Sequence, residues 1–142
     1  MKRRSVLQAS VVGVAAGSLL ANTAVAGSNK GGKFAGAVYY TKENPGRWEK
    51  KAAGHLPVVQ TEVKDGKKMV TVTTPHEMTS EHYIVKHTLL DEKMNVLGER
   101  VFYPGKDAAA ISSYDVQDYK GKVYAVSMCN KHDTWLAESR VS

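Results

Sequence analysis

From residue 58 onward, short segments rich in β-branched residues alternate with turn sequences, and this alternation limits the fold more than any other feature. The segment 58–63 is followed by Lys-Asp-Gly-Lys at 64–67, which favours a hairpin turn. Strands separated by turns about every 8–12 residues are typical of an antiparallel sandwich or barrel, so the sequence predicts an all-β fold. The expected strands are 58–63, 69–74, 83–90, 96–103 (with a bulge at Gly98) and 123–128, while the alanine-containing stretch 108–116 fits a strand or a helix.

Four of the five histidines and the only cysteine fall at turn-like points between these segments. Imidazole nitrogens combined with one thiolate suit iron, copper or zinc, whereas calcium and magnesium prefer oxygen ligands. The loops of a sandwich gather at its ends, so one rim could bring all five side chains together. The sequence therefore predicts one transition-metal site. The motifs are His55-Leu56-Pro57, Pro75-His76-Glu77-Met78, Glu81-His82-Tyr83-Ile84 and Cys129-Asn130-Lys131-His132.

The first 26 residues have the features of an export signal. Residues 2–4 are basic, a run of small apolar residues extends from 11 to 20, and Ala-Val-Ala at 24–26 forms a cleavage site. The run is too short and too rich in small residues to be a membrane anchor. Arg3-Arg4 resembles the twin-arginine signal, which exports folded proteins, with an ordinary secretory signal as the alternative. We therefore expect residues 1–26 to be a twin-arginine signal peptide and the protein to be periplasmic or otherwise extracytoplasmic.

Residues 27–142 are then expected to form one domain of 116 residues, which is long enough to bury an adequate core. This part contains 17 of the 20 basic residues and all 14 acidic ones, a formal net charge of +3. A charge this small without an arginine cluster argues against nucleic acid as a partner and is compatible with attracting a small anion. With a single cysteine no intramolecular disulfide can form, and the sequence Cys-Asn-Lys-His favours a metal thiolate over a small buried hydrophobe for Cys129.

The order and spacing of the motifs resemble the superoxide reductases, namely the iron-binding domain of the desulfoferrodoxin and neelaredoxin family. The resemblance covers the chain from about residue 40 onward. No cysteine-rich, rubredoxin-like segment precedes it, so the chain resembles the one-iron class. The similar pieces are Trp48-Glu49-Lys50, His55-Leu56-Pro57-Val58, Thr74-Pro75-His76-Glu77-Met78-Thr79, Glu81-His82-Tyr83-Ile84, Asn95-Val96 and Cys129-Asn130-Lys131-His132 followed by Trp135.

The resemblance implies an immunoglobulin-like antiparallel β-sandwich of about seven strands that binds one non-haem iron. It implies one-electron reduction of superoxide to hydrogen peroxide without release of oxygen, with a separate protein as electron donor and a homo-oligomer as one possible assembly. Backbone N–H groups near Asn130 and Lys131 are expected to donate to the sulfur. The implied ligands are His55, His76, His82 and His132 in the equatorial plane and Cys129 as the axial thiolate, with the sixth position open.

The chain departs from the family pattern before the first ligand. Many members have a Glu-Lys pair directly before this histidine, and the lysine steers superoxide and helps protonation. Here Glu49-Lys50 is separated from His55 by Lys51 and by Ala-Ala-Gly at 52–54, which resembles an insertion in a flexible loop. We expect Lys51 to be the catalytic lysine, with Lys50 as the second choice, and Glu49 is a doubtful sixth ligand.

Two other classes of site remain open from the residues alone. A periplasmic cupredoxin uses two histidines, one cysteine and usually a methionine after the last histidine, but no methionine follows His132. A structural zinc site rarely uses five protein ligands. The remaining histidine, His87, lies outside the motifs and is expected on the surface, while Trp48 and Trp135 are expected to line the site or pack in the core.

The export hypothesis is tested by replacing Arg3 and Arg4 together with lysine. We expect unprocessed precursor to accumulate in the cytoplasm, because the paired arginines are the part of the signal that the twin-arginine route reads. Cell fractionation and immunoblotting measure this. Normal export of the double variant would contradict the hypothesis.

Overall fold

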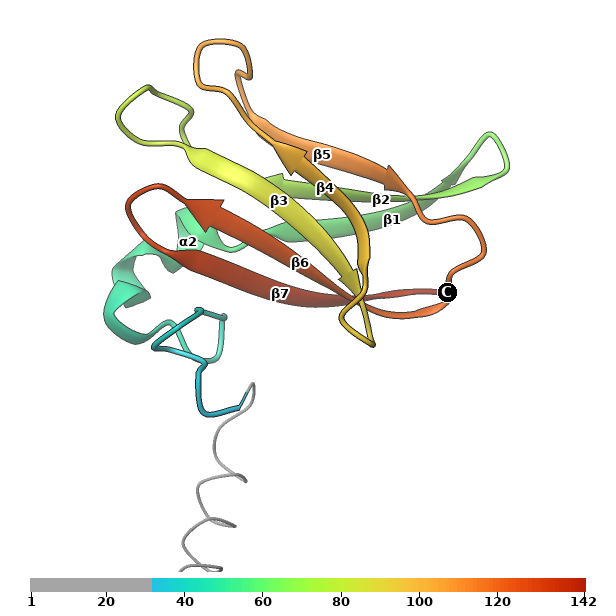
Figure 1. The fold of residues 1–142 in the computed structure, drawn as a ribbon, viewed down its shortest axis with the longest axis horizontal. Helices are drawn as coiled ribbons and strands as arrows, with labels where there is room; N and C mark the ends of the chain where they lie inside the picture. The colour runs from blue at the N-terminus through green and yellow to red at the C-terminus, as the bar shows by residue number, and fades with distance from the viewer. Residues whose placement is uncertain (1–31) are drawn as a thin grey trace, which may run out of the picture. The chain divides into compact units, whose positions relative to one another are not determined.

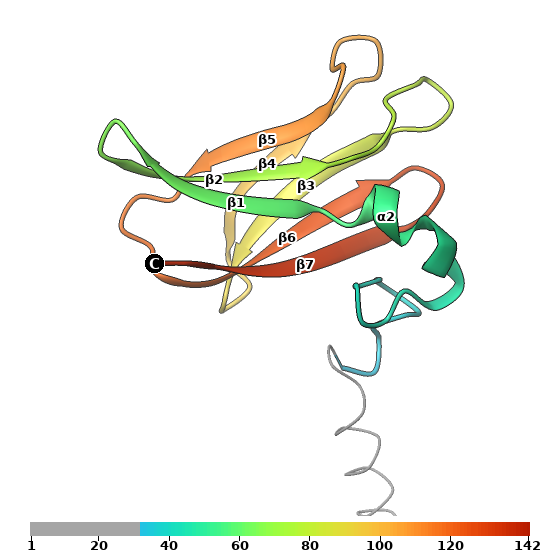
Figure 2. The same cartoon turned by 180° about the vertical axis from the view of Figure 1, so that it is seen from behind.

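Seven strands in two antiparallel sheets dominate the computed structural model, which describes residues 32–142 (Figures 1 and 2). One sheet has the strand order β1-β2-β5 and the other has the order β4-β3-β6-β7. The predicted all-β, seven-stranded antiparallel sandwich is thereby confirmed. The elements are the 3-10 helix η1 (Gly46–Lys51), the short helix α2 (Ala52–His55), β1 (Val58–Lys64), β2 (Lys67–Thr74), β3 (Ile84–Asp91), β4 (Val96–Val101), β5 (Ala110–Asp115), β6 (Gly121–Cys129) and β7 (Thr134–Val141).

The main hydrophobic core lies between the two sheets. Along β5 and β6 buried residues alternate with more exposed ones, as expected when one face of a strand packs against the opposite sheet. Each fully buried valine or leucine contributes roughly 1.5–3 kcal/mol relative to an exposed one, so this core is the main source of stability. Its members are Val70, Val72, Leu89, Tyr114, Val116, Val123, Ala125 and Val141.

The strand directions gather the metal-binding motifs at one end of the sandwich. The strands β2 and β6 end there, and β3 and β7 begin there (Figure 1). The short helix α2 leads into β1 at the same end (Figure 2). The hairpin between β1 and β2 and the C-terminus lie at the opposite end. The predicted gathering of the motif loops at one rim is therefore what the topology produces.

Several expected elements differ from the observed ones. The stretch 108–116, which fitted a strand or a helix, contains the strand β5. The strand β7 was not predicted, and Thr134–Val141 includes alanine and glutamate, which are depleted in strands. Residues 52–54 belong to helix α2, so the expected flexible insertion is an ordered turn.

Gly98 has a packing role in β4. The register shift between β3 and β4 falls opposite the step from Leu89 to Leu90, next to Gly98. A Cβ atom at Gly98 would lie 2.2 Å from the Tyr114 ring, so the missing side chain makes room for this aromatic residue of the facing sheet.

The predicted signal peptide, residues 1–26, lies outside the described residues. Within 32–142, neither of the two helices has the length and apolar character needed to cross a membrane.

The expectation that His87 is a surface residue is wrong. Its side chain is fully buried between the sheets and makes an edge contact with the ring of Phe102. Its Nε2 lies 2.8 Å from the Thr74 hydroxyl and its Nδ1 lies 2.8 Å from the Ser112 hydroxyl. The Thr74 hydroxyl also lies 2.7 Å from that of Ser127. This network joins the two sheets, because Thr74 and Ser112 belong to one sheet and His87 and Ser127 to the other. Both ring nitrogens of His87 are paired within it, so neither is free to bind a metal.

The buried position of His87 predicts a loss of stability in acid. Burial, with a smaller effect of the Arg100 charge, lowers the pKa of His87 to about 4. Between this value and the ordinary pKa of about 6.5 the unfolded chain binds a proton that the folded chain does not, so stability falls as pH falls. We expect a loss of up to about 3 kcal/mol from this residue between pH 7 and pH 4.

Urea unfolding of the metal-free protein across this pH range measures the effect, and His87→Gln is the comparison because it cannot titrate. The variant is expected to be less stable at pH 7, since the buried hydroxyls lose their partner, and to have a shallower pH dependence. An identical pH dependence in the two proteins would show that His87 does not carry the effect.

Candidate metal centre

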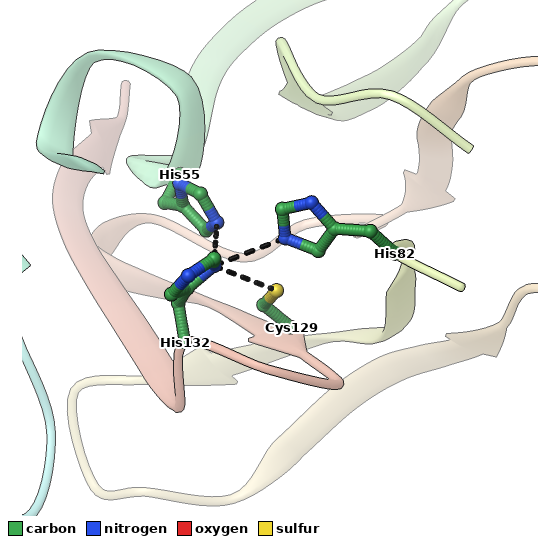
Figure 3. A group of neighbouring side chains, drawn as sticks. All are labelled: His55, His82, Cys129 and His132. Atoms are coloured by element: carbon green, nitrogen blue, oxygen red, sulfur yellow. Dashed lines mark hydrogen bonds between the residues drawn. The ribbon is translucent and has the colours of Figure 1, made fainter. Parts of the chain in front are cut away.

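Five donor side chains from four loops and strand ends converge at this end of the sandwich. His55 closes α2, while His76 and His82 lie in the loop between β2 and β3. Cys129 is the last residue of β6, and His132 lies in the turn before β7. Figure 3 shows His55, His82 and Cys129 arranged around His132, and dashed lines mark the contact of each with His132. The structure therefore brings together all five side chains that the motifs single out.

The four imidazoles present one nitrogen each to a common space. The distance from His76 Nε2 to His82 Nε2 is 3.0 Å, and that from His82 Nε2 to His132 Nδ1 is also 3.0 Å. His132 Nδ1 lies 3.1 Å from His55 Nε2. Two nitrogens that each lie about 2.1 Å from a metal ion, at right angles to one another, are about 3.0 Å apart. The spacing of the nitrogens would thus allow these imidazoles to bind one metal ion together.

The sulfur of Cys129 completes the group of donors. It lies 3.7 Å from His132 Nδ1 and 3.9 Å from His76 Nε2. The ligand atoms of His55, His82, Cys129 and His132 all lie within 4.8 Å of one another. His76 adjoins this group, because its ring centroid is 4.2 Å from that of His82 and 4.5 Å from that of His55.

The partners of the outer ring nitrogens determine which nitrogens carry protons. His55 Nδ1 donates to the Lys51 carbonyl at 2.8 Å, and His76 Nδ1 donates to the Glu77 carbonyl at 2.5 Å. His82 Nδ1 donates to Glu77 Oε1 at 2.9 Å. In a neutral ring the second nitrogen is then an unprotonated acceptor. Three lone pairs therefore face the common space with no proton to share, which is an arrangement that a bound cation stabilises.

Burial and nearby charges favour the neutral form of His55, His76 and His132. Burial lowers the pKa of His55 to about 4 and also lowers the pKa of His76. The pKa of His132 is lowered by burial first and then by nearby positive charges, among them those of Lys51 and Lys131. Neutral imidazole is the form that binds metal ions, so these side chains are ready to bind at neutral pH without first losing a proton.

The thiol group of Cys129 is buried and has a hydrogen-bond donor beside it. The Lys131 backbone N–H points to the sulfur at 3.4 Å, as predicted. The prediction for Asn130 is wrong, because its backbone N–H donates to the Tyr83 carbonyl. The Asn130 side chain instead accepts from the Tyr83 N–H and donates to the Glu81 carbonyl, so it joins the loop that contains His82 to the loop that contains Cys129.

Aromatic side chains line the site. Trp48 makes an edge contact with His132, with ring centroids 4.7 Å apart, and its Nε1 donates to Asp133 at 2.8 Å. Trp135 is fully buried beside His55 and donates from Nε1 to the His132 carbonyl at 2.8 Å. The expectation that the two tryptophans line the site and pack in the core is confirmed. The hydrogen bond from Trp48 to Asp133 was not predicted. The position of Asp133 directly after the motif residue His132 is a signal that could have indicated a role near the site.

Of the three charged residues Glu49, Lys50 and Lys51, Lys51 is the one whose contacts with the donors are recorded. Its carbonyl accepts from His55, its side chain is exposed, and its charge acts on His132. Glu49 and Lys50 are also exposed, on η1.

Comparison with known proteins gives a consistent picture. A family model described as desulfoferrodoxin matches residues 46–138. No curated protein matches the chain significantly. Among solved structures, a variant of superoxide reductase (neelaredoxin) from Ignicoccus hospitalis is 27% identical, with a TM-score of 0.61 over 75% of this chain and 95% of its own.

Two further solved structures are similar. A variant of superoxide reductase (neelaredoxin) from Archaeoglobus fulgidus, in the reduced form, is 25% identical, with a TM-score of 0.56 over 65% of this chain and 91% of its own. A superoxide reductase in the oxidised state is 28% identical, with a TM-score of 0.53 over 62% of this chain and 88% of its own. These proteins share the fold and nearly their full length with this chain.

The assignment of donors is tested by titrating the metal-free protein with Co²⁺, which reports thiolate binding as a charge-transfer band. Cys129→Ser is expected to abolish this band, and His76→Ala to weaken Co²⁺ binding by at least about tenfold. His87→Gln is the control, because both nitrogens of His87 are paired in the core, and it should bind Co²⁺ like the unchanged protein. Competition with a chelator measures the affinities. Loss of Co²⁺ binding in the folded control, or an unchanged band in Cys129→Ser, would contradict the assignment.

Proposed function

The chain belongs to the desulfoferrodoxin family, and we propose that it is a superoxide reductase with one non-haem iron. The proposed ligands are the four imidazoles and one thiolate described above. The observation that carries the proposal is the convergence of these five donors on one space, with the Nδ1 atoms of His55, His76 and His82 held by acceptors outside it. The superoxide reductases that share the fold supply the class of reaction.

The set of donors also favours iron over the two alternatives. A blue-copper site uses two histidines and one cysteine, so two of the four imidazoles here would have no role. A structural zinc site is almost always complete with four ligands. Five donors leave one position of an octahedral ion for a small ligand, which suits reaction with superoxide.

In the proposed reaction, superoxide takes up one electron and two protons and becomes hydrogen peroxide. When bound, the iron supplies the electron and attracts the anion, and a separate donor protein replaces that electron after each turnover. The four neutral imidazoles leave the positive charge of the ion largely uncompensated, so the anion remains attracted. The Lys131 N–H at the sulfur moderates the negative charge of the thiolate.

Lys51 is proposed as the lysine that steers superoxide. It stands directly before α2, four residues ahead of His55, and side chains four residues apart lie on one face of a helix. Its ammonium group is close enough to His132 to affect the pKa of that ring. Lys131 acts on the same ring and was not predicted to contribute charge. Lys50 precedes Lys51 by one residue and is therefore on a different face.

The proposal is tested by pulse radiolysis of the reduced iron protein. Each superoxide consumed should yield one hydrogen peroxide and no oxygen, whereas a dismutase would release oxygen and an electron carrier would form no peroxide by direct reaction. Lys51→Ala is expected to lower the second-order rate constant by roughly tenfold and to flatten its dependence on ionic strength, because steering by a charge is screened by salt.

Lys50→Ala is the matched control and should keep most of the rate. Lys131→Ala separates the contribution of the second lysine and leaves the backbone N–H to the sulfur in place. A rate constant in Lys51→Ala equal to that of the unchanged protein at low salt would refute the role of Lys51. Release of oxygen by the unchanged protein would refute the proposed reaction.

A further inference from the structure

Glu77 contacts two of the proposed ligands at once. Its backbone carbonyl accepts from His76 Nδ1 at 2.5 Å, and its carboxylate Oε1 accepts from His82 Nδ1 at 2.9 Å. We propose that Glu77 is the positioning residue of the metal centre, which orients both imidazoles and makes His82 the strongest nitrogen donor. The inference rests on the metal centre proposed above, but not on the reaction with superoxide.

The acceptor of the His82 Nδ1 proton is charged, unlike the acceptors of His55 and His76. The Nδ1 atoms of His55 and His76 donate to neutral carbonyls, whereas that of His82 donates to a carboxylate. Hydrogen bonds to a charged acceptor are stronger, and a carboxylate behind an imidazole raises the basicity of the nitrogen that binds the metal. A more basic donor stabilises the higher charge of Fe³⁺ more than that of Fe²⁺. Glu77 is therefore expected to lower the reduction potential of the centre.

The loop is built to keep this contact in place. The Thr79 hydroxyl accepts from the His82 N–H at 3.1 Å, and the Thr79 N–H donates to the His82 carbonyl at 3.1 Å. Asn130 fixes the same loop from the other side through Glu81 and Tyr83. The backbone of residues 79–83 is thus tied down on both sides of His82.

The exposure of Glu77 indicates that its contact with His82 affects metal binding more than the stability of the fold. Its side chain is 58% exposed, whereas that of His82 is 18% exposed. An exposed ion pair adds little to stability, so a purely structural role would be weak. An imidazole bound to a cation has a more acidic N–H, and the hydrogen bond to the carboxylate then becomes stronger. The contact is consequently most favourable when a metal is bound.

Three variants separate position from charge. Glu77→Ala removes the carboxylate and leaves the backbone carbonyl for His76. Glu77→Gln keeps an acceptor oxygen and removes the charge. Glu81→Gln is the matched control, because it removes one charge from the same loop at a side chain that hydrogen-bonds to Ser80 and, within residues 32–142, has no recorded hydrogen bond to a proposed ligand.

The first measurement is the affinity of the metal-free protein for Co²⁺ in competition with a chelator. Glu77→Ala is expected to bind Co²⁺ about 10–100-fold more weakly, as for other residues behind a metal ligand, and Glu81→Gln within about twofold of the unchanged protein. Equal affinities in all three proteins would overturn the positioning role. Absence of Co²⁺ binding in the unchanged protein would instead refute the metal centre itself.

The second measurement is the reduction potential of the iron-loaded protein, followed through its visible absorption band. Glu77→Gln is expected to lose about tenfold more affinity for Fe³⁺ than for Fe²⁺, which raises the potential by about 59 mV for a one-electron couple. The change should exceed that in Glu81→Gln. If Glu77→Ala unfolds, Glu77→Gln still decides the question, and equal potentials in Glu77→Gln and Glu81→Gln would overturn the charge effect.

Discussion

Nitrogen lone pairs that face one another across about 3 Å, without a proton between them, are the constraint on which the rest of this structure depends. His76 Nε2 and His82 Nε2 are in this position when the rings are neutral, because the Nδ1 atom of each ring then donates its proton to an outer acceptor. Such an arrangement is unfavourable without a cation, so the scaffold must impose it. The two sheets do this by ending their strands around one space, and a buried hydrogen-bond network joins the sheets just before the His76 loop begins. The members of this network are His87, Thr74, Ser112 and Ser127.

The outer hydrogen bonds divide the imidazoles into unlike ligands. His55 depends on a carbonyl of its own helical turn, so its orientation follows from the formation of α2. His76 and His82 share one residue, so the orientation of both depends on one turn of the loop. His132 is oriented by tryptophans, through an edge contact and through its carbonyl. Local hydrogen bonds and ring contacts thus orient each ligand, while the sandwich brings the ligands to one place.

The sequence predicted the donor residues well, because they lie in short motifs. It predicted less well the residues whose environment depends on which face of a strand is buried. The five donors could be found because each stands beside proline, a turn or another donor. His87 could not be placed, because its neighbours Lys86 and Thr88 suggest a polar strand and only the facing sheet shows that the alternate residues point inward. The strand β7 depends on its pairing with β6, and the contact of Glu77 with His82 depends on the path of the loop between them. Residue composition reveals neither.

The helix α2 determines where Lys51 lies relative to His55. If Ala-Ala-Gly at 52–54 were a flexible loop, the backbone would not fix the direction of either lysine before it. As the helix α2, the same residues add about one turn, which carries the chain back to the same face. Lys51 then lies on the side of His55, where its charge acts on His132, while its own carbonyl fixes the ring of His55. One residue therefore contacts the ring of His55 through its backbone and acts on His132 through its charge. A substitution that disrupts α2 would affect both, whereas a change of the Lys51 side chain alone would affect only the action on His132.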